Sequence, residues 1–288
     1  MTSQNLSVKP ALRAKTNSTK PRTIPVRLGL TILVLGMGGA VALPAVASLS
    51  QLTQPLPLSF KLSQIPASAK VVYVNPAFGS DSPGAGESAD AAYRTITYAL
   101  QQVQGLTVIR LAAGSYSRQT GEVFPLVTKP GVILQGDESS KGQTVLLIGG
   151  GDYVSPTFAK QNITIRAETN SEIRGITITN PNTRGTAVWI ESSNPTISNN
   201  TFANSLRDGV FVTGTATPKI EANVFTKNSG NGVSVARSAQ GEIRNNLFQS
   251  TGFGIAVGGT ATPLIEGNQI LQNQVGVVVS NAARPILR

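Results

Sequence analysis

The sequence predicts an all-β fold, a right-handed, single-stranded parallel β-helix with about 22–24 residues per coil and a short capping helix near its N-terminus. Two observations lead to this fold. The segment 185–288 repeats itself, and the apolar residues in each repeat alternate over bursts of four to six residues, the periodicity of a strand. A unit this short cannot bury its own apolar face, so successive units must stack and share one core.

The repeat aligns in five lines, each of which opens with a glycine and a short apolar burst. The glycines, spaced by 24, 23, 22 and 22 residues, are Gly185, Gly209, Gly232, Gly254 and Gly276. A valine column predicted to face the core contains Val188, Val212, Val235, Val257 and Val279. Isoleucines one loop later form the column Ile197, Ile220, Ile243 and Ile265. Three short strands per coil, each paired in parallel with its counterpart one coil later, explain these columns.

Three further columns support the same register. Asparagines predicted at a turn, where stacked amides can bond along the axis, are Asn200, Asn223, Asn246 and Asn268. The next apolar column is Phe202, Phe225, Phe248 and Ile270. An outward column contains Ser198, Glu221, Arg244, Glu266 and Arg288. Its charges alternate in sign from Glu221 onward, as neighbouring rungs of one sheet prefer.

The pattern x-I-x-x-N-x-F in these lines resembles the repeat of the pectin-lyase-like parallel β-helix superfamily, over about a third of the chain. The resemblance implies the fold. It implies no particular activity, because this superfamily includes lyases, hydrolases, esterases, adhesins and many proteins of unknown function.

Residues 1–47 are predicted to be a signal peptide or a signal anchor. A basic lead is followed by an uncharged apolar run from Leu28 to Leu43 and by Ala45-Val46-Ala47, a small-x-small cleavage pattern. We therefore expect export to the periplasm, the cell surface or the extracellular space, with membrane contact only through an uncleaved N-terminal segment. Residues 48–69 show no period and are predicted to be a linker.

Residues 70–160 are predicted to form an N-terminal cap and the first coils, and residues 161–288 the regular repeats. Thr95 can begin a helix whose apolar face carries Ile96, Ala99, Leu100 and Val103. Such a helix would cover the open first coil. The repeats stop in mid-coil without a second cap. The unpaired edges there predict either end-to-end self-association, with a partner or a second copy, or a shortened form of a longer solenoid.

The cap resembles a domain of unknown function that begins many bacterial, notably cyanobacterial, exported β-helix proteins. The similar stretches are Tyr73-Val-Asn-Pro76, Tyr93-Arg-Thr-Ile-Thr97, Ala113-Gly114-Ser-Tyr116 and Gly121-Glu-Val-Phe-Pro-Leu126. This resemblance implies an exported β-helix with no established reaction.

Composition excludes several kinds of chemistry. The chain has no histidine and no cysteine, which excludes imidazole and thiol catalysis and argues against a zinc site.

The net charge of +10 is concentrated at the N-terminus, since residues 1–47 hold six basic residues and no acid, which leaves 18 basic and 14 acidic residues elsewhere. No basic stripe with interleaved aromatics remains there, so nucleic acid is not an expected partner.

Two carboxylates are candidate metal ligands, although no cofactor is required by the sequence. If Asn162 takes the glycine position of its coil, Glu168 and Glu191 lie roughly 4.8 Å apart on one outer face. Two like charges so close are unfavourable unless a cation, a proton or an arginine compensates them. A calcium ion is one explanation, and an ion-pair cluster with Arg166 and Arg184 is the other.

Exposed aromatic residues suggest a carbohydrate site. Trp189, the only tryptophan, and Phe211 are predicted to point outward from neighbouring strands, where they would form a platform for a sugar. The candidate carbohydrate-binding residues are Trp189, Phe211, Glu191, Asp208 and Arg237. The alternative is that a loop such as 181–184 covers the two aromatic rings.

Three functions follow as hypotheses. Non-catalytic binding of polysaccharide or cell-envelope carbohydrate is favoured, because the known catalytic constellations are missing. The second is a polysaccharide lyase or glycoside hydrolase that acts on an acidic glycan at the face of Trp189 and Glu191. The third is a surface assembly protein.

Overall fold

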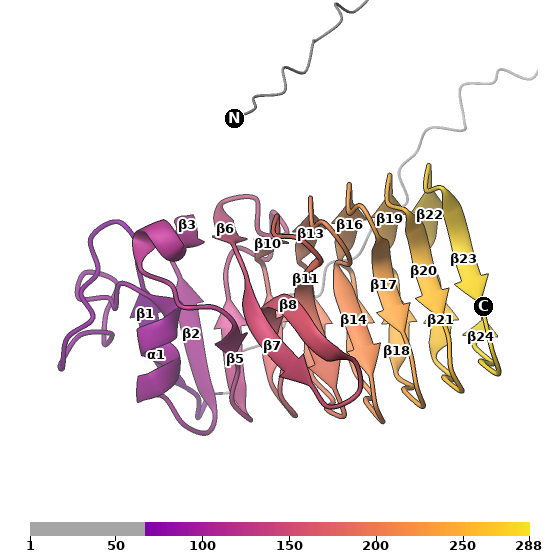
Figure 1. The fold of residues 1–288 in the computed structure, drawn as a ribbon. Helices are drawn as coiled ribbons and strands as arrows, with labels where there is room; N and C mark the ends of the chain where they lie inside the picture. Colours follow the sequence, from indigo (N-terminus) through magenta and orange to yellow (C-terminus); the bar gives the residue numbers. More distant parts are fainter. Residues whose placement is uncertain (1–66) are drawn as a thin grey trace, which may run out of the picture. The chain divides into compact units, whose positions relative to one another are not determined.

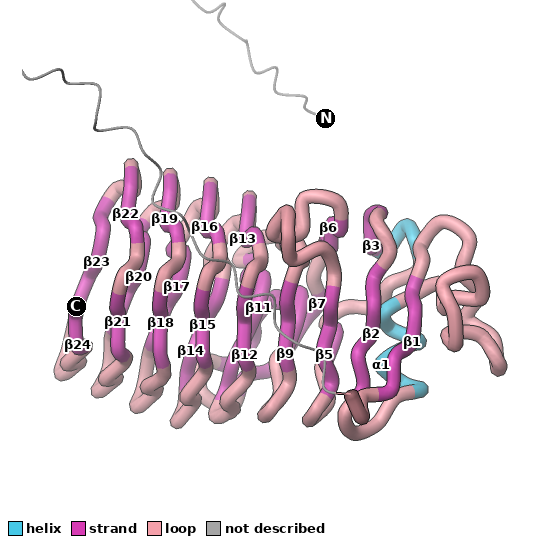
Figure 2. Tube along the Cα trace, turned by 180° about the vertical axis from the view of Figure 1, so that it is seen from behind, coloured by secondary structure: helices cyan, strands magenta, loops and turns pink. Residues whose placement is uncertain are grey.

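The computed structural model describes residues 67–288. The predicted signal segment 1–47, and the predicted linker 48–69 apart from its last residues, lie outside this range. Within it, the chain winds as a right-handed parallel β-helix, with three sheets that run along the axis (Figures 1 and 2). The predicted fold class is confirmed.

Each complete coil contributes one strand to each sheet, and sheet A has one further strand at each end. Sheet A contains, in spatial order, β1 (Lys70–Val74), β2 (Thr107–Leu111), β5 (Val132–Gln135), β9 (Glu172–Arg174), β12 (Thr196–Ser198), β15 (Lys219–Glu221), β18 (Glu242–Arg244), β21 (Leu264–Glu266) and β24 (Ile286–Leu287). Sheet B contains β3 (Gly114–Ser117), β6 (Val145–Ile148), β10 (Thr177–Thr179), β13 (Thr201–Ala203), β16 (Val224–Thr226), β19 (Leu247–Gln249) and β22 (Gln269–Leu271). Sheet C contains β4 (Leu126–Val127), β8 (Ala159–Arg166), β11 (Gly185–Glu191), β14 (Val210–Thr213), β17 (Asn231–Val235), β20 (Phe253–Val257) and β23 (Val275–Val279).

Stacked apolar columns fill the space between the sheets. The isoleucine column is in register from Ile197 through Ile220 and Ile243 to Ile265, as predicted. The phenylalanine column is stacked as well, with ring centroids 4.9 Å apart between Phe202 and Phe225 and 4.6 Å apart between Phe225 and Phe248. One continuous core therefore runs along the axis.

One predicted pairing in sheet C is wrong by two residues. Val188 pairs with Val210, and Ile190 pairs with Val212, whereas the repeat alignment placed Val188 beside Val212. A shift of two residues leaves every side chain on the same face of the sheet, so the hydrophobic pattern cannot reveal it. From Val212 onward the valine column is in the predicted register.

The asparagine column forms a ladder of amides inside the turns between sheets A and B. The backbone N and the Nδ2 of Asn200 both donate to Oδ1 of Asn223, over 2.9 and 3.1 Å. Asn223 donates in the same way to Asn246, and Asn246 to Asn268. Each Nδ2 also donates to a carbonyl of the preceding coil, such as Ile197 O at 2.9 Å. The ladder satisfies backbone groups that the turns would otherwise bury without partners.

The predicted charge alternation on the outside of sheet A is present. Arg244 forms ion pairs with Glu266 of the next coil and, over 3.1 Å, with Glu242 of its own strand. Arg288 lies 4.0 Å from Glu266. All of these side chains are partly solvated, so each pair contributes only about 0–1 kcal/mol.

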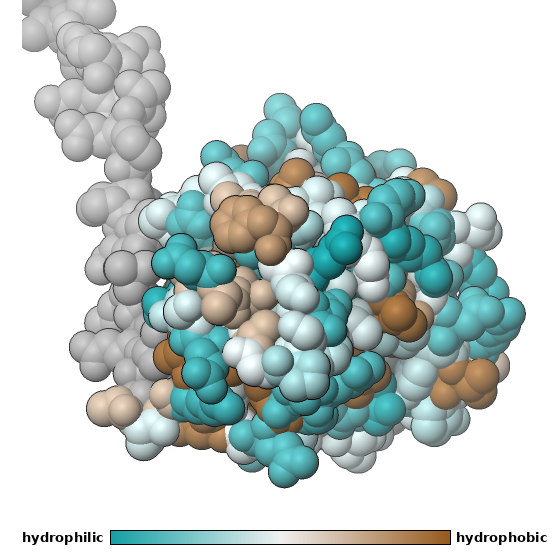
Figure 3. All heavy atoms as spheres, turned by 90° about the vertical axis from the view of Figure 1, so that its left-hand side faces the viewer, coloured by the Kyte–Doolittle hydropathy of each residue, from teal (hydrophilic) through white to brown (hydrophobic). Residues whose placement is uncertain are grey.

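A helix and a loop cover the N-terminal end of the core. Helix α1 (Ile96–Gln102) begins at Thr95, whose hydroxyl accepts a hydrogen bond of 3.0 Å from Tyr98 N. Its apolar side chains Ile96, Ala99 and Leu100 are buried against the first coils, as predicted. A 3₁₀ turn, η2 (Arg118–Thr120), follows β3. Viewed from this end, the surface intermixes polar and apolar residues (Figure 3). None of the helical segments in residues 67–288 has the length and apolar character needed to cross a bilayer.

The last coil of the described chain lacks such a cover. The end strands of the three sheets there are β22, β23 and β24. Apolar side chains that remain 41–58% exposed on this rung are Leu271, Val275, Val279, Ile286 and Leu287. End-to-end self-association at this rung stays a prediction.

Candidate functional site

A β-hairpin that the repeat pattern did not predict lies on the outer face of sheet C. Strand β7 (Gly151–Ser155) pairs antiparallel with the first half of β8, and the two cross over the neighbouring coils (Figure 1). Gly151 allows the hairpin to start close to the preceding coil, because a Cβ there would lie 2.1 Å from Phe124 O. The turn closes at Ala159, which has a φ of +56°.

The hairpin buries the aromatic residues that were expected to form an exposed platform. Trp189 and Phe211 stack face to face with centroids 4.4 Å apart, on directly paired positions of β11 and β14. Phe158 packs edge-on against both rings, and Tyr153 against Trp189. Trp189 is fully buried and Phe211 is 5% exposed. The expected exposure is therefore wrong, and the cover is this hairpin rather than the loop 181–184.

Glu191 fastens the hairpin to the sheet. Its Oε1 accepts hydrogen bonds from Ser155 Oγ at 2.8 Å, Thr157 N at 2.9 Å and Thr157 Oγ1 at 2.6 Å. Its Oε2 accepts from Tyr153 Oη at 2.8 Å and from Trp189 Nε1 at 3.0 Å. Burial and the bond to Glu191 raise the pKa of Tyr153 to about 12, so this phenol stays a donor at neutral pH.

The other two predicted carbohydrate ligands also belong to this structural cluster. Arg237 Nη2 donates to Thr157 O over 2.7 Å, and its guanidinium lies over the ring of Phe158. Asp208 is 1% exposed, pairs with Arg207 at 3.2 Å and accepts a bond from the backbone of the next coil. Burial raises the pKa of Asp208, and Arg207 opposes that shift. The structure gathers Trp189, Phe211 and Glu191 under the hairpin, whereas Arg237 contacts the hairpin from an exposed position.

The two candidate calcium ligands have protein partners instead of a shared cavity. Asn162 pairs with Gly185, as the alignment required. Glu168 forms an ion pair of 2.9 Å with Arg166, while Glu191 is occupied by the hairpin. Nowhere in residues 67–288 do three or more acidic side chains gather in an arrangement suited to a metal ion.

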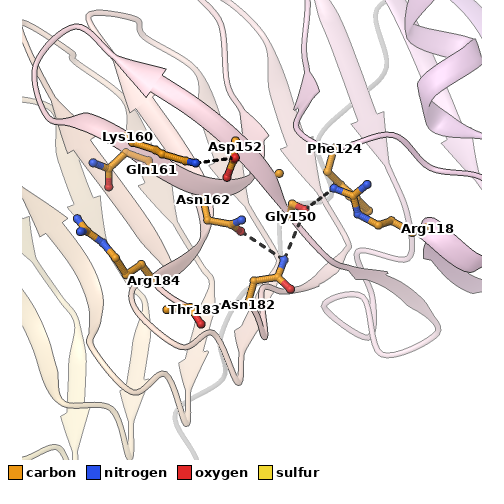
Figure 4. Close-up of a pocket in the computed structure, with 11 residues that line it drawn as sticks. Arg118, Phe124, Gly150, Asp152, Lys160, Gln161, Asn162, Asn182, Thr183 and Arg184 are labelled. Atoms are coloured by element: carbon orange, nitrogen blue, oxygen red, sulfur yellow. Dashed lines mark hydrogen bonds and ion pairs between the residues drawn. The ribbon is translucent and has the colours of Figure 1, made fainter.

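A cleft of about 880 Å³ opens at the base of the hairpin (Figure 4). Its walls come from three consecutive coils, because the lining residues follow β3, β6 and β10, which are neighbours in sheet B. Arg118 follows β3, Gly150 follows β6, and Asn182 and Arg184 follow β10. We take this cleft as the candidate functional site.

Amide side chains form the middle of the cleft. Asn162 Oδ1 accepts hydrogen bonds from Asn180 Nδ2 at 3.1 Å and Asn182 Nδ2 at 3.3 Å. Neither Nδ2 of Asn162 nor Oδ1 of Asn182 is bonded to another described residue, and both residues line the cleft. Gly150 lets the amides approach, since a Cβ there would lie 2.4 Å from Asn180 Nδ2. One free donor and one free acceptor are thus held beside each other.

Cationic groups outnumber acids around these amides. Lys160 is neutralised by Asp152 at 2.9 Å, on the hairpin. Arg118 Nη2 donates to Gly150 O at 3.0 Å, and its guanidinium lies near the ring of Phe124. Arg184 is exposed and contacts no described charged group. The cleft is therefore polar, open and positively charged, and Asp152 is its single described carboxylate.

Sequence reasoning missed this cleft, because its residues lie in the segments that follow β3, β6 and β10, which differ in length and interrupt the repeat. Two features of the sequence could have indicated the cleft. One is the run Gly149-Gly150-Gly151 before the stretch that forms β7, and the other is the set of asparagines at positions 162, 180 and 182. The sequence analysis assigned Arg184 to an ion-pair cluster around Glu168 and Glu191, and the loop 181–184 to a cover over two aromatic rings, rather than to a cleft.

Comparisons with known proteins found a matching family model and similar solved structures. A family model described as "Protein of unknown function (DUF1565)" matches residues 77–286. The crystal structure of Jun a 1, the major allergen from cedar pollen, is similar with 12% identity, a TM-score of 0.43 and coverage of 76% of this chain and 80% of that chain. The family 28 exopolygalacturonase of Yersinia enterocolitica is similar with 11% identity, a TM-score of 0.29 and coverage of 77% and 66%.

A search of curated protein sequences found no match. The family match covers well over half of the chain and includes all but the first of the stretches that resembled a domain of unknown function. The chain belongs to the DUF1565 family of proteins of unknown function.

Proposed function

We propose that this protein is an exported β-helix that binds carbohydrate without cleaving it, in the cleft at the base of the β7–β8 hairpin. Export is proposed from the basic lead, apolar run and cleavage pattern of residues 1–47. Carbohydrate binding is proposed because the cleft is open and polar.

The observation that carries the proposal is the fixed amide pair in an open cleft. A sugar presents neighbouring hydroxyls that each donate and accept hydrogen bonds, and Asn162 Nδ2 and Asn182 Oδ1 offer the complementary donor and acceptor. Their neighbours already hold both side chains, so little rotamer entropy is lost when a ligand binds.

Cleavage is less well supported by the groups present. Hydrolysis of a glycosidic bond commonly uses two carboxyl groups that face each other across it. Among the described lining residues Asp152 is the single carboxylate, and it is paired with Lys160. The proposal therefore assigns the cleft to binding alone.

The test is titration calorimetry of the exported chain with neutral and acidic cell-wall polysaccharides, for the wild type and for Asn182→Ala. Asn182 makes only two long side-chain bonds, so this variant should keep its fold while its affinity falls about tenfold. Gln274→Ala, an exposed amide far along the solenoid, is the matched control and should bind as the wild type does. If no polysaccharide binds, the proposal fails.

The same mixtures should be assayed for products, with and without calcium. No cleavage is expected. Formation of unsaturated or reducing ends would overturn the non-catalytic assignment and favour a lyase or a hydrolase.

A further inference from the structure

We infer that the cleft recognises its carbohydrate through two anionic groups of one chain, one held by Arg118 and the other by Arg184. This inference rests on the proposed function and adds the chemical class of the ligand. It also gives the ligand a direction, along the solenoid axis.

The placement of the two arginines is the first argument. Figure 4 shows Arg118 and Arg184 on opposite sides of the cleft, with Gly150, Asn162 and Asn182 between them. Arg118 follows β3 and Arg184 lies just beyond β10, two rungs further along sheet B. Successive rungs are about 4.8 Å apart, so the two backbone positions are separated by roughly 10 Å along the axis. With the two guanidinium groups on opposite sides of the cleft, as Figure 4 shows, each would hold its own anionic group.

The state of each guanidinium is the second argument. Arg118 uses one N–H for Gly150 O and rests near Phe124, which fixes its orientation and leaves further N–H donors for a ligand. Arg184 has no bonded partner among the described residues, and its backbone is in the left-handed region at φ +58°. Because Asp152 is paired with Lys160, the cleft offers neither arginine a carboxylate of its own. Both are therefore free to form charge-assisted bonds with an anion.

The amides between the arginines complete the match. A chain with an acidic group at each end of a hydroxyl-bearing unit would place its charges on the arginines and its hydroxyls on Asn162 and Asn182. Carboxylates of uronic acids and sulfate esters share this chemistry. Both present oxygens that a guanidinium can bind in a bidentate way.

The test compares defined oligosaccharides by calorimetry. The probes are galacturonate of one and of three units, the carboxyl-reduced neutral trimer, and a sulfated galactose trimer. We expect one acidic trimer to bind at least tenfold more tightly than the acidic monomer and the neutral trimer, with an affinity that falls as salt rises. The preferred trimer distinguishes carboxylate from sulfate.

Variants of Arg118 and Arg184 test the contact of each arginine with an anionic group. Arg184→Gln and Arg118→Gln should each weaken the acidic trimer about tenfold to a hundredfold, and should leave the neutral trimer unchanged. Arg284→Gln removes the same charge from an exposed position at the far end and should have no effect. Because Arg118 also holds Gly150, Arg118→Lys is included, and its affinity for the acidic trimer should exceed that of Arg118→Gln.

The failures of the two proposals can be told apart. If the neutral trimer binds as tightly as the acidic ones, or if Arg184→Gln leaves the acidic trimer unaffected, the two-anion inference is overturned while carbohydrate binding stands. If no carbohydrate binds at all, both are overturned.

Discussion

Trp189 donates a hydrogen bond of 3.0 Å from its indole Nε1 to Oε2 of Glu191, two residues further along β11. Both side chains point outward from sheet C, and the β7–β8 hairpin covers them. The same carboxylate holds the tip of the hairpin through Ser155 and Thr157. The only tryptophan of the chain therefore reports directly on the contact that fastens the hairpin.

Replacement of Glu191 by glutamine should loosen the hairpin. The neutral amide has one acceptor oxygen where the carboxylate has two, and its NH₂ group would face donors such as Tyr153 Oη and Trp189 Nε1. We expect a loss of about 2 kcal/mol in the free energy of unfolding by urea, since hydrogen bonds to a charged group contribute about 1.5–3 kcal/mol each and solvent partly replaces them here. The emission of Trp189 should shift to longer wavelength.

The control for this variant is Glu221→Gln, an exposed carboxylate on the charge ladder of sheet A. It should change neither the emission nor the stability by more than about 0.5 kcal/mol. Unchanged emission in Glu191→Gln would show that the hairpin is held mainly by its aromatic contacts.

Acid should break the hydrogen bonds between Glu191 and the hairpin. Burial raises the pKa of Glu191. The hydrogen bonds from Thr157, Tyr153, Ser155 and Trp189 together lower the pKa by more than burial raises it, so the net pKa lies below the ordinary value of 4.5. A carboxyl whose pKa is lowered in the folded state stabilises the fold above its unfolded pKa, and this contribution is lost as pH falls through the folded pKa. Trp189 emission should therefore be constant from neutral pH down to about pH 4.5 and should change below it.

Glu191→Gln supplies the comparison for the acid titration. Its emission at neutral pH should already resemble that of the acidified wild type, and the transition below pH 4.5 should be much smaller. A transition of the same size in both proteins would assign the change to another group.

The sequence predicted the core of the solenoid well because the repeat imposes the same environment on each coil. The isoleucine, asparagine and phenylalanine columns all stack as aligned. At the exception, Val188 pairs with Val210, 22 residues later, rather than with Val212. Both registers bury the same face, so the apolar pattern fits either one.

The candidate site was less predictable, because it lies where the repeat is interrupted. Within residues 67–288 the hairpin occurs once, so no second copy shows which of its residues face the sheet. Trp189 was correctly assigned to the outer face, but an outward direction does not imply exposure when an insertion covers that face. Arg118 and Arg184 lie 66 positions apart in the sequence and meet at one cleft only because the coils stack.

Truncation of the amide ladder should be most costly at its centre. Asn223 is 1% exposed, donates to Ile197 O and Asn246 Oδ1, and accepts from Asn200. Asn223→Ala leaves the buried N–H of Asn200 and the carbonyl of Ile197 without these partners. Each unsatisfied group costs about 1–3 kcal/mol, so we expect a loss of at least about 3 kcal/mol in urea unfolding.

The end of the ladder supplies the matched comparison. Asn268 makes equivalent bonds to Asn246 and to Ile243 O, but it is only partly buried, so water can replace it. Asn268→Ala should cost less than half as much as Asn223→Ala. Equal losses at the two positions would mean that burial does not set the strength of the ladder.

The N-terminal cap should depend on Glu122. Its Oε1 accepts from Ile96 N at 2.7 Å, and its Oε2 accepts from Thr97 N at 2.9 Å and Thr97 Oγ1 at 2.6 Å. These are first-turn donors of α1 that have no partner within the helix. Glu122→Gln turns an NH₂ group toward one of them and should destabilise the fold by about 1–2 kcal/mol.

Hydrogen exchange should show which part of the chain Glu122→Gln destabilises. The amides of Ile96 and Thr97 should exchange at least tenfold faster in Glu122→Gln, while the amides of the asparagine ladder should keep their protection, because the ladder lies coils away from the cap. Glu87→Gln, an exposed acid in the same cap, should alter neither rate. Uniformly faster exchange along the whole solenoid would instead mean that the cap and the coils unfold as one unit, and that Glu122 stabilises the core rather than its end.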